Sequence, residues 1–412
     1  MFRCFFRHIL LVSVCFLLLA ASARADAGTE YFQRQWRYVS ETSAVIYWQL
    51  GDISKAAVSY VEYGRTRELG QKTPTAKGPR WAQFHRLKGL ETRAKYYYRM
   101  VVIDQGSQQE KRSGIKEFTT VERKETVRIP GDFLSGPPYV LDKENTYYIL
   151  TDDIITDGTA IEVAAKNVTL DLDGHTVTFG NNTTEQVYGV RLADPGGSTL
   201  CNGHIAQGAR SRDYSAAVAS LKRPVPSNIF GISTDVHLPN AYPMKFSNAS
   251  KFKIHHNHLY SRVTEIECRH YPGNCLMEVY TYGGQIHIHD NLLTEGCHRG
   301  LLVRVQSRTA RDIEVEYNDI RHHQQYVNGY ALAARTNANI HHNKVTSTGR
   351  GVHLTGDGTL FHDNYIDITG HMHLSDLPAH TRPFHHRMVE LHGIKFEGRQ
   401  TRNCKIYNNF VR

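Results

Sequence analysis

The sequence predicts an all-β protein in which an antiparallel β-sandwich precedes a solenoid of short stacked strands. Two observations carry this prediction. Between Tyr31 and Thr120, five runs rich in β-branched and aromatic residues follow one another at the spacing of about ten residues that is typical of a sandwich. Beyond residue 140, a strand pattern centred on asparagine recurs six times, which is the kind of internal repeat that builds a solenoid.

Residues 1–25 have the features of a secretory signal peptide. A basic start precedes an apolar run from Ile9 to Ala21, and small residues allow cleavage after Ala23 or Ala25. The alternative is a retained membrane anchor, but the apolar run is shorter than the roughly 20 residues that a span needs. No later segment could cross a membrane. We therefore expect an exported protein, secreted or periplasmic, with no membrane span.

The charge balance favours an anionic partner. The formal net charge is +9 and the isoelectric point is near 9.1. Lysine and arginine do not gather into a run, as they would in a nucleic-acid-binding arm. Because we also expect export, the predicted partner is an anionic polysaccharide and not nucleic acid.

Five cysteines remain beyond the signal peptide. They are Cys201, Cys268, Cys275, Cys297 and Cys404. Cys268 and Cys275 stand close together in "ECRHYPGNC", so they could close a short disulfide loop in an oxidising compartment. At least one thiol is then free or pairs between chains. No CxxC is present, so a cysteine-ligated zinc site is not expected.

Residues 30–120 resemble a fibronectin type III domain. The resemblance rests on the phrase "LKGLETRAKYYYR", Leu87 to Arg99, which follows a strand that contains Trp48. It implies an accessory or spacer module whose tyrosines lie in the interior and at corners, in preference to forming a sugar-binding platform. A linker, residues 121–139, is first charged and then rich in glycine and proline.

The repeat is clearest when its copies are aligned on Asn257, Asn291, Asn318, Asn343, Asn364 and Asn409. Successive copies are 21 to 45 residues apart, and the residues three before and two after the asparagine are apolar in all six. Alternation of this kind buries one row of side chains in a column shared by all coils. We expect the asparagine to lie at a bend, to tolerate unusual backbone angles and to stack on the asparagine of the next coil.

These repeats, together with "NVTLDLDGHTVTF" from Asn167 to Phe179, resemble the pectate-lyase-like superfamily. The resemblance implies a right-handed parallel β-helix over residues 140–412 and a carbohydrate-active protein. Because the sequence stops within a coil at Arg412 with no polar cap, we expect either a fragment or further coils.

Histidines recur two residues before the repeated asparagine. That position holds His255, His289, Glu316, His341, His362 and Tyr407. Adjacent coils place such side chains about 5 Å apart in a surface ladder. A metal needs convergent ligands, and a ladder that is interrupted by Glu316 and Tyr407 offers little convergence. We interpret the ladder as structural, and a copper or zinc site is the open alternative.

One further strand lies between consecutive asparagine turns, and these strands should form a second sheet. Its inward residues are expected to be Val190, Ile232, Met277, Leu301, Tyr330, Val352 and Val389. Its first exposed row is expected to be Arg191, Ser233, Glu278, Leu302, Ala331, His353 and Glu390. Its second exposed row is expected to be Ala193, Asp235, Tyr280, Arg304, Ala333, Thr355 and His392.

Long connections on either side of three short-looped coils predict a groove on this sheet. The long connections are 205–231, 259–276 and 366–388, and long loops in compact folds are often functional. Ala331 and Ala333 would form a depression in the floor. Around it we expect Tyr280, Arg304, Arg335, His353, Glu390 and His392.

The residues in this groove favour β-elimination over hydrolysis. Glycoside hydrolysis usually takes two carboxylates about 5 to 10 Å apart, and four coil steps separate Glu278 from Glu390 by about 19 Å. Asp235 and Glu278 are closer but lie at the edge of the groove. The paired aspartates of β-helix polygalacturonases are absent from these strands.

β-Elimination on a uronate needs a cation for the sugar carboxylate, a base for the C5 proton and an acid for the leaving oxygen. The candidate catalytic residues are therefore Arg304, His353 and Tyr280. The candidate substrate-binding residues are Arg335, Glu278, Glu390, His392 and Asp235.

No catalytic residue can be transferred from the superfamily. Its lyases often use calcium or a basic side chain, but the matching calcium-and-arginine motif is absent, so calcium stays an open cofactor. The "DPHD" phrase of alginate epimerases is also absent. The predicted function is a polysaccharide lyase, and the alternatives are a hydrolase or epimerase on the same fold and a non-catalytic glycan-binding scaffold.

Overall fold

The computed structural model describes residues 30–193, 196–220, 227–238, 241–247, 249–262, 275–281, 284–296, 299–305, 312–322, 329–335, 337–369, 393–396 and 403–412. All regular elements in these ranges are strands, which confirms the predicted all-β class. The predicted signal peptide lies outside the described residues. The chain divides into two compact units. The first contains residues up to Trp36 with 47–85 and 95–118, and the second contains 37–46, 86–94 and 119–412.

The N-terminal region consists of antiparallel sheets, as predicted. Its strands are β1 (Gln33–Val39), β2 (Ala44–Gln49), β3 (Ala57–Gly64), β4 (Gln71–Lys72), β5 (Ala82–Leu87), β6 (Lys95–Asp104), β7 (Glu110–Arg112) and β8 (Lys116–Thr119). Strand β6 pairs antiparallel with β3 and β7. Alternation along β6 buries Tyr96, Tyr98 and Met100, so Tyr96 and Tyr98 are interior residues, as expected.

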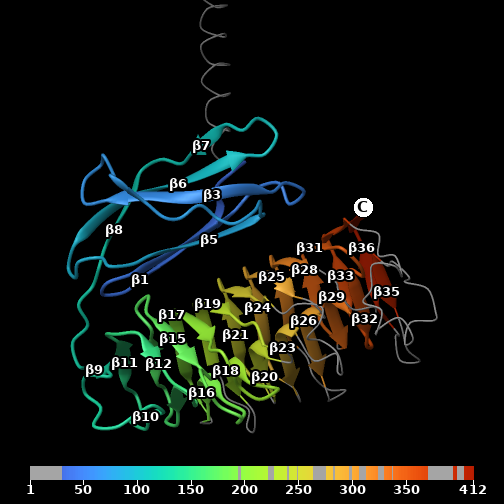
Figure 1. Cartoon of the computed structure of the whole chain (residues 1–412). Coiled ribbons are helices and arrows are strands. Elements are labelled where there is room, and N and C mark those ends of the chain that lie inside the picture. Colours follow the sequence, from blue (N-terminus) through green and yellow to red (C-terminus); the bar gives the residue numbers. More distant parts are fainter. Residues whose placement is uncertain are drawn as a thin grey trace, which may run out of the picture. The chain divides into compact units, whose positions relative to one another are not determined.

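The second unit is a parallel β-helix with three strands in each regular coil. The coil that begins at Phe252 runs through β21 (Phe252–His255), β22 (His258–Tyr260) and β23 (Cys275–Thr281), and each strand pairs in parallel with its equivalent in the next coil. Figure 1 shows the strands side by side, in colours that run from green near β11 to red near β36. The prediction of a parallel solenoid is confirmed.

Three faces result from this stacking. The first face, before the asparagine turn, contains β9 (Thr126–Ile129), β11 (Tyr147–Leu150), β14 (Thr169–Asp171), β17 (Ser198–Gln207), β19 (Ser227–Asp235), β21, β24 (Ile286–His289), β27 (Ile313–Glu316), β30 (Asn339–His341), β33 (Leu360–His362) and β36 (Lys405–Tyr407). The second face, after the turn, contains β12 (Ile154–Ile155), β15 (Thr176–Phe179), β22, β25 (Leu292–Gly296), β28 (Asp319–His322), β31 (Lys344–Ser347), β34 (Tyr365–Ile368) and β37 (Phe410–Val411), and β17 and β19 extend into it.

The third face is a sheet of ten parallel strands. They are β10 (Tyr139–Leu141), β13 (Ile161–Val163), β16 (Tyr188–Leu192), β18 (Ala216–Ser220), β20 (Tyr242–Phe246), β23, β26 (Arg299–Val305), β29 (Tyr330–Arg335), β32 (Val352–Thr355) and β35 (Ile394–Phe396). Its inward row runs through Met244, Met277, Leu301, Leu332 and Val352, all fully buried. This row and the apolar residues of the other faces form one continuous core.

The repeated asparagines form a buried ladder of side-chain amides. The amide of Asn291 donates to the Asn318 side-chain oxygen at 2.9 Å and to the Ile254 carbonyl at 2.9 Å. Its own oxygen accepts from the backbone N–H and the side-chain amide of Asn257 at 3.2 and 3.0 Å. Stacking of the asparagines is therefore confirmed.

The unusual backbone angle belongs to the residue before each asparagine. His256, Asp290, Tyr317, His342, Asp363 and Asn408 have φ between +53° and +54°. We had expected the asparagine itself to have a positive φ, and this was wrong. The asparagine instead contributes its side chain, which satisfies backbone carbonyls and N–H groups of two coils.

The predicted position of one coil on the third face was wrong. The stretch that contains Ile232, Ser233 and Asp235 is β19, which pairs with β17 and β21 on the other faces. The third face is continued instead by β18 and β20, which were not predicted. Ser233 bonds to Arg86 and His204, and Asp235 forms an ion pair with Arg262 at 2.8 Å.

A corner glycine explains a second error in register. A Cβ on Gly300 would come within 2.5 Å of the Ala331 carbonyl oxygen and 2.7 Å of Ile320, so only glycine fits this corner. In the next coil Ala331 takes the equivalent place, because Leu301 pairs with Leu332. Ala331 therefore points into the core, whereas Tyr330 joins the outward cluster, the reverse of the prediction.

The predictions for the last strand of the third face and for the disulfide involve residues that the structure does not describe. Val389, Glu390 and His392 are not described, and the strand beside β32 is β35, which places Lys395 next to His353. Cys275 is a free, buried thiol, whereas the sequence had left open a disulfide with Cys268, which is not described.

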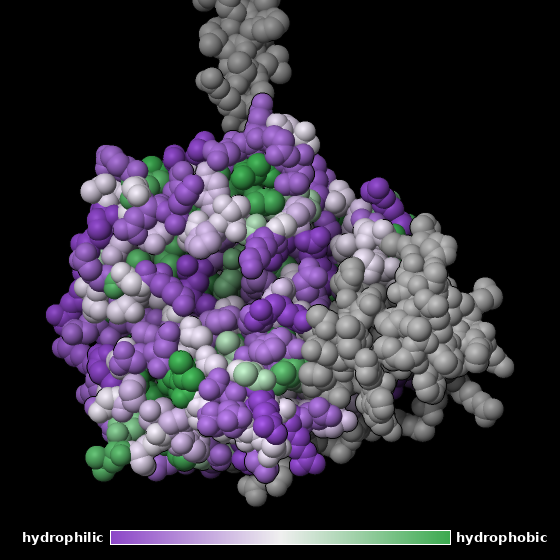
Figure 2. Space-filling model, in the orientation of Figure 1, coloured by the Kyte–Doolittle hydropathy of each residue, from purple (hydrophilic) through white to green (hydrophobic). Residues whose placement is uncertain are grey.

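The surface is polar. The described part of the face in Figure 2 is dominated by hydrophilic residues, and its hydrophobic residues lie in small separate groups. The mean hydropathy of the chain is −0.45. In the described part of the chain, none of the elements is a helix that could span a bilayer.

Candidate functional site

Two outward rows on the third face carry most of the candidate residues. The first row is Lys245, Glu278, Leu302, Ala333, His353 and Lys395. The second row is Tyr280, Arg304, Arg335 and Thr355. Neighbours within a row lie about 5 Å apart at the strand spacing. The register thus brings Tyr280, Arg304 and Arg335 together on three successive coils.

Tyr280 and Arg304 form a cation–aromatic pair. The Arg304 guanidinium carbon lies 5.5 Å from the centre of the Tyr280 ring, and Arg304 is exposed. Burial raises the pKa of Tyr280, and the hydrogen-bonded carboxylate of Glu278 raises the pKa further. Tyr280 is therefore a neutral phenol at neutral pH, and it is suited to donating a proton more than to accepting one.

A second cation–aromatic group lies two coils before Arg304. The Lys245 ammonium is 4.3 Å from the centre of the Tyr242 ring and 4.9 Å from that of Tyr214, and the two rings stack at 6.5 Å. Burial raises the pKa of Tyr242, so this phenol also stays neutral. Tyr214 is 40% exposed, so the group reaches the surface.

A pocket adjoins Tyr214 and extends the basic character of this region. Its lining includes Gln186, Arg210, Arg212 and Asp213 as well as Tyr214, so two cations there stand against one carboxylate. Lys245, Arg304 and Arg335 thus place cations on three strands of this sheet, β20, β26 and β29, while the intervening β23 carries Glu278 beside Lys245. Such an arrangement attracts a polyanion.

The central part of the predicted groove is more buried than expected. Glu278 is 6% exposed and His353 is 7% exposed, while Leu302 and Ala333 belong to a buried cluster with Tyr330. These side chains nevertheless point outward from the sheet. The prediction of two exposed rows was therefore wrong for these four residues.

His353 is held by an aromatic stack. Its ring lies 4.5 Å from that of Tyr330, at 23° between planes. Arg350 lies on the same tyrosine, with its guanidinium carbon 5.4 Å from the ring centre and a 3.4 Å hydrogen bond to the hydroxyl. This packing fixes the imidazole and limits its access to a substrate.

The structure therefore unites some predicted site residues and separates others. Tyr280, Arg304, Arg335, Glu278 and His353 lie on one face, as predicted. Asp235 lies on another face, and Glu390 and His392 are not described. The sequence analysis missed Tyr214, Tyr242 and Lys245, although the alternation in "YPMKF" (Tyr242 to Phe246) was available as a signal.

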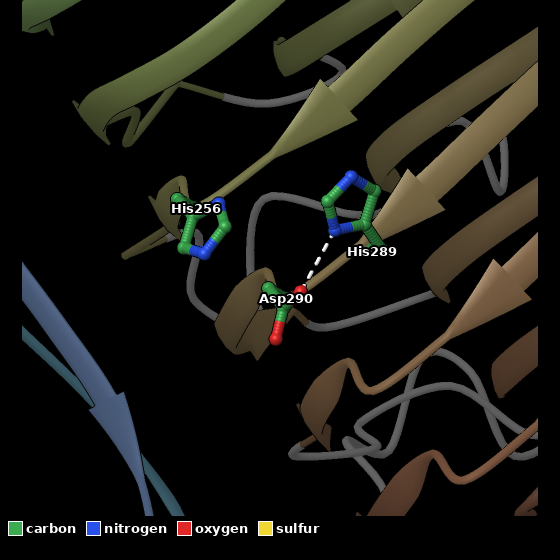
Figure 3. A group of neighbouring side chains, drawn as sticks. All are labelled: His256, His289 and Asp290. Atoms are coloured by element: carbon green, nitrogen blue, oxygen red, sulfur yellow. Dashed lines mark hydrogen bonds and ion pairs between the residues drawn. The ribbon is translucent and has the colours of Figure 1, made fainter. Parts of the chain in front are cut away.

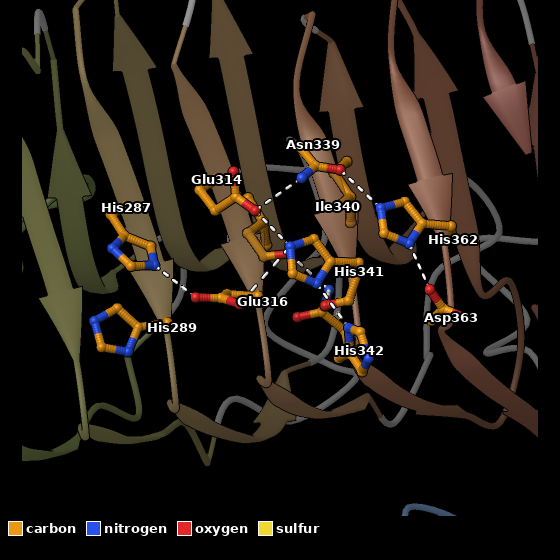
Figure 4. A network of polar contacts seen from close by, with 12 residues as sticks. His287, His289, Glu314, Glu316, Asn339, Ile340, His341, His342, His362 and Asp363 are labelled. Carbon is orange, nitrogen blue, oxygen red and sulfur yellow. Dashed lines mark hydrogen bonds and ion pairs between the residues drawn. The ribbon is translucent and has the colours of Figure 1, made fainter.

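The predicted side-chain ladder is present on the first face. His255 stacks on His289 at 4.9 Å and 6°, and His341 stacks on His362 at 4.9 Å and 10°. Glu316 separates the two stacks and accepts a hydrogen bond from His287 at 2.9 Å. Figure 4 shows this network, in which His341 also contacts Glu314.

Two groups of side chains in the described residues bring potential metal ligands together. The first is His256, His289 and Asp290, all buried, and the second is Glu314, Glu316 and His341, all half-buried. In each group the ligand atoms lie within 4.8 Å of one another. His256 and Asp290 occupy the turn position directly before the asparagine, whereas the predicted ladder uses the position two before it.

Comparison with known proteins assigns no family to this chain. No family model and no curated protein sequence matches the chain. Among solved structures, the chain is similar to a family 28 exopolygalacturonase of Yersinia enterocolitica, with 8% sequence identity and a TM-score of 0.39. The alignment covers 92% of this chain and 98% of that protein.

Proposed function

We propose that this protein is an exported, carbohydrate-active protein that binds an anionic, uronate-containing polysaccharide along the third face. The observation that carries the proposal is the recurrence of cations beside tyrosine rings: Lys245 on Tyr242, and Arg304 on Tyr280. Carboxylates pair with lysine and arginine, and sugar rings pack on accessible aromatic surfaces such as that of Tyr214, which is exposed, whereas Tyr242 is buried. A linear polyanion that runs along the sheet would meet Lys245 on β20, Arg304 on β26 and Arg335 on β29.

The reaction that suits these residues best is β-elimination. A base removes the C5 proton, the electron pair forms the C4–C5 double bond, and the C4–oxygen bond breaks. Arg304, assisted by Arg335, would neutralise the uronate carboxylate and so make the C5 proton more acidic. Tyr280 would donate its proton to the departing oxygen, because its raised pKa keeps it protonated.

His353 is the candidate base in this scheme, and its position is less favourable. It is 7% exposed and stacked on Tyr330, so a substrate reaches it only if this packing rearranges. That observation favours a second candidate function, in which the face binds the polysaccharide without cleaving it.

The test is incubation with a panel of uronate polymers, followed by ultraviolet absorbance of unsaturated ends and by a reducing-end assay. We expect unsaturated product from at least one polymer, and Tyr280→Phe should lower its rate about 100-fold or more. Reducing ends without unsaturation would indicate a hydrolase. Retention that depends on Arg304 without any product would establish the non-catalytic alternative, and neither retention nor product would refute both.

A further inference from the structure

The first face contains the same pair of turns twice. "HHN" at residues 255–257 is followed in the next coil by "HDN" at 289–291, and "HHN" at 341–343 is followed by "HDN" at 362–364. In both copies the two neighbouring histidines contact each other through their Nδ1 atoms at 2.7 Å. In both, the next histidine contacts its aspartate, at 2.7 Å in the first copy and 2.6 Å in the second.

The first copy brings three ligand groups together in a protected place. His256, His289 and Asp290 are 6%, 8% and 2% exposed, and their ligand atoms lie within 4.8 Å of one another. Figure 3 shows His256 from one turn facing His289 and Asp290 from the next. Zinc bonds to nitrogen and oxygen are about 2.0 to 2.2 Å long, so small side-chain rotations would close this triangle around an ion.

Hydrogen bonds orient His256 for such a role. The Asn228 side-chain oxygen accepts from Nε2–H of His255 at 3.1 Å, so Nδ1 of His255 carries a lone pair. That lone pair accepts from Nδ1–H of His256, which leaves Nε2 of His256 as an acceptor.

His289 and Asp290 supply the other two ligands. Nδ1–H of His289 donates to the Asp290 carboxylate, and Nε2 of His289 is buried without a hydrogen-bond partner. A cation between Nδ1 and the carboxylate would replace that proton, and the imidazole would carry its proton on Nε2 instead.

We propose that His256, His289 and Asp290 bind a divalent transition-metal ion of the zinc type. Two imidazoles and one carboxylate form a common zinc ligand set with a fourth position for water. The chain of hydrogen bonds from Asn228 through His255 holds one ligand in its binding tautomer, as outer partners do at metal sites. This proposal does not rest on the proposed polysaccharide function.

The second copy serves as a matched control. Its turn histidine, His342, lies 6.4 Å from His362 between ring centres, whereas His256 lies 5.7 Å from His289. Tyr317 stacks on His342 at 4.8 Å, and His341 is engaged with Glu314 and Glu316. In the second copy the two histidine rings thus lie farther apart and already contact other side chains. We therefore expect the second copy to bind the ion more weakly than the first.

The test measures zinc binding to the full chain after removal of metals with a chelator. We expect one zinc per chain by calorimetry and metal analysis, a higher melting temperature with zinc, and affinity at least tenfold lower for His256→Asn and Asp290→Asn. His342→Asn should bind as the wild type does. Asparagine is chosen because Asn408 already occupies this turn position with positive φ.

Folding is checked separately, so that a loss of binding can be interpreted. Each variant should melt cooperatively in chelator at a temperature close to that of the wild type. A wild-type protein that binds no zinc, or a His256→Asn variant that binds it unchanged, would overturn the proposal. Loss of the bound zinc in His342→Asn but not in His256→Asn would also overturn it, because the ion would then belong to the second copy.

Discussion

The asparagine turn and the third face of the same coils differ in how strictly they repeat. At the turn, Asn257, Asn291, Asn318, Asn343 and Asn364 make nearly the same hydrogen bonds in five successive coils. On the third face, the outward row changes from lysine to glutamate, leucine, alanine and histidine. A buried amide that serves two coils tolerates no substitute, whereas an outward position is free to vary. Variation on the third face is therefore where a specific function can develop.

The largest expected effect is at the centre of the amide ladder. Asn291→Ala would take from the Ile254 carbonyl the amide that donates to it, and from the backbone N–H and side-chain amide of Asn257 the oxygen that accepts from them. Each buried group that loses its partner costs about 1 to 3 kcal/mol, so we expect a loss of about 3 to 5 kcal/mol in the free energy of unfolding. Urea denaturation of the β-helix measures it.

The same substitution at the last described rung is the control. Asn409 is only half-buried, so Asn409→Ala should cost about 1 kcal/mol or less. If both substitutions lowered the free energy of unfolding equally, burial would not be what determines how much each asparagine stabilises the fold.

The corner of the third face should be nearly as sensitive. Gly300→Ala would place a Cβ within 2.5 Å of the Ala331 carbonyl oxygen, which requires the backbone to shift. We expect a loss of about 1 to 3 kcal/mol, the usual cost of overpacking. Gly158→Ala is the control, because nothing lies within 4 Å of its added Cβ, and it should leave stability nearly unchanged. If Gly300→Ala left the free energy of unfolding unchanged, the claim that this corner of the third face requires glycine would be wrong.

Stability should fall in mild acid because of buried histidine on the first face. The pKa of His255 is lowered to about 2 in the folded protein, whereas that of an unfolded histidine is near 6.5. The neutral His255 therefore makes its full contribution to the free energy of unfolding above pH 6.5. This contribution declines as the pH falls, by about 2 kcal/mol at pH 5. Urea denaturation of the wild type and His255→Phe at pH 7.5 and 5 should show a smaller decline for the variant. Equal declines would rule out a neutral, buried His255.

The sequence was sufficient to predict the features that repeat. Parallel coils, the apolar column, the asparagine stack and the histidine ladder all follow from a pattern that recurs at fixed offsets. Tyr280 and Arg304 were also placed correctly on adjacent strands, because Met277 and Leu301 fix the register there.

The features that failed depend on contacts between distant residues. Gly329 looked like the corner glycine of its coil, but Ala331 occupies that corner. The strand Tyr242–Phe246 has neither the glycine nor the asparagine that marked other coils, so it was overlooked. Burial of His353 and Glu278 depends on what covers the sheet, and alternation within a strand carries no information about that.

The central claim is that the third face binds the ligand and the ladder supports the fold. The most direct measurement compares Arg304→Ala and His362→Ala in a uronate-polymer retention assay at low and high salt. Arg304→Ala should keep its stability within about 0.5 kcal/mol, because the side chain is exposed. It should lose at least tenfold in affinity, since a charge-assisted contact contributes about 1.5 to 3 kcal/mol. His362→Ala should bind as the wild type does. Full binding by Arg304→Ala together with loss in a folded His362→Ala would contradict the account and place the function on the first face.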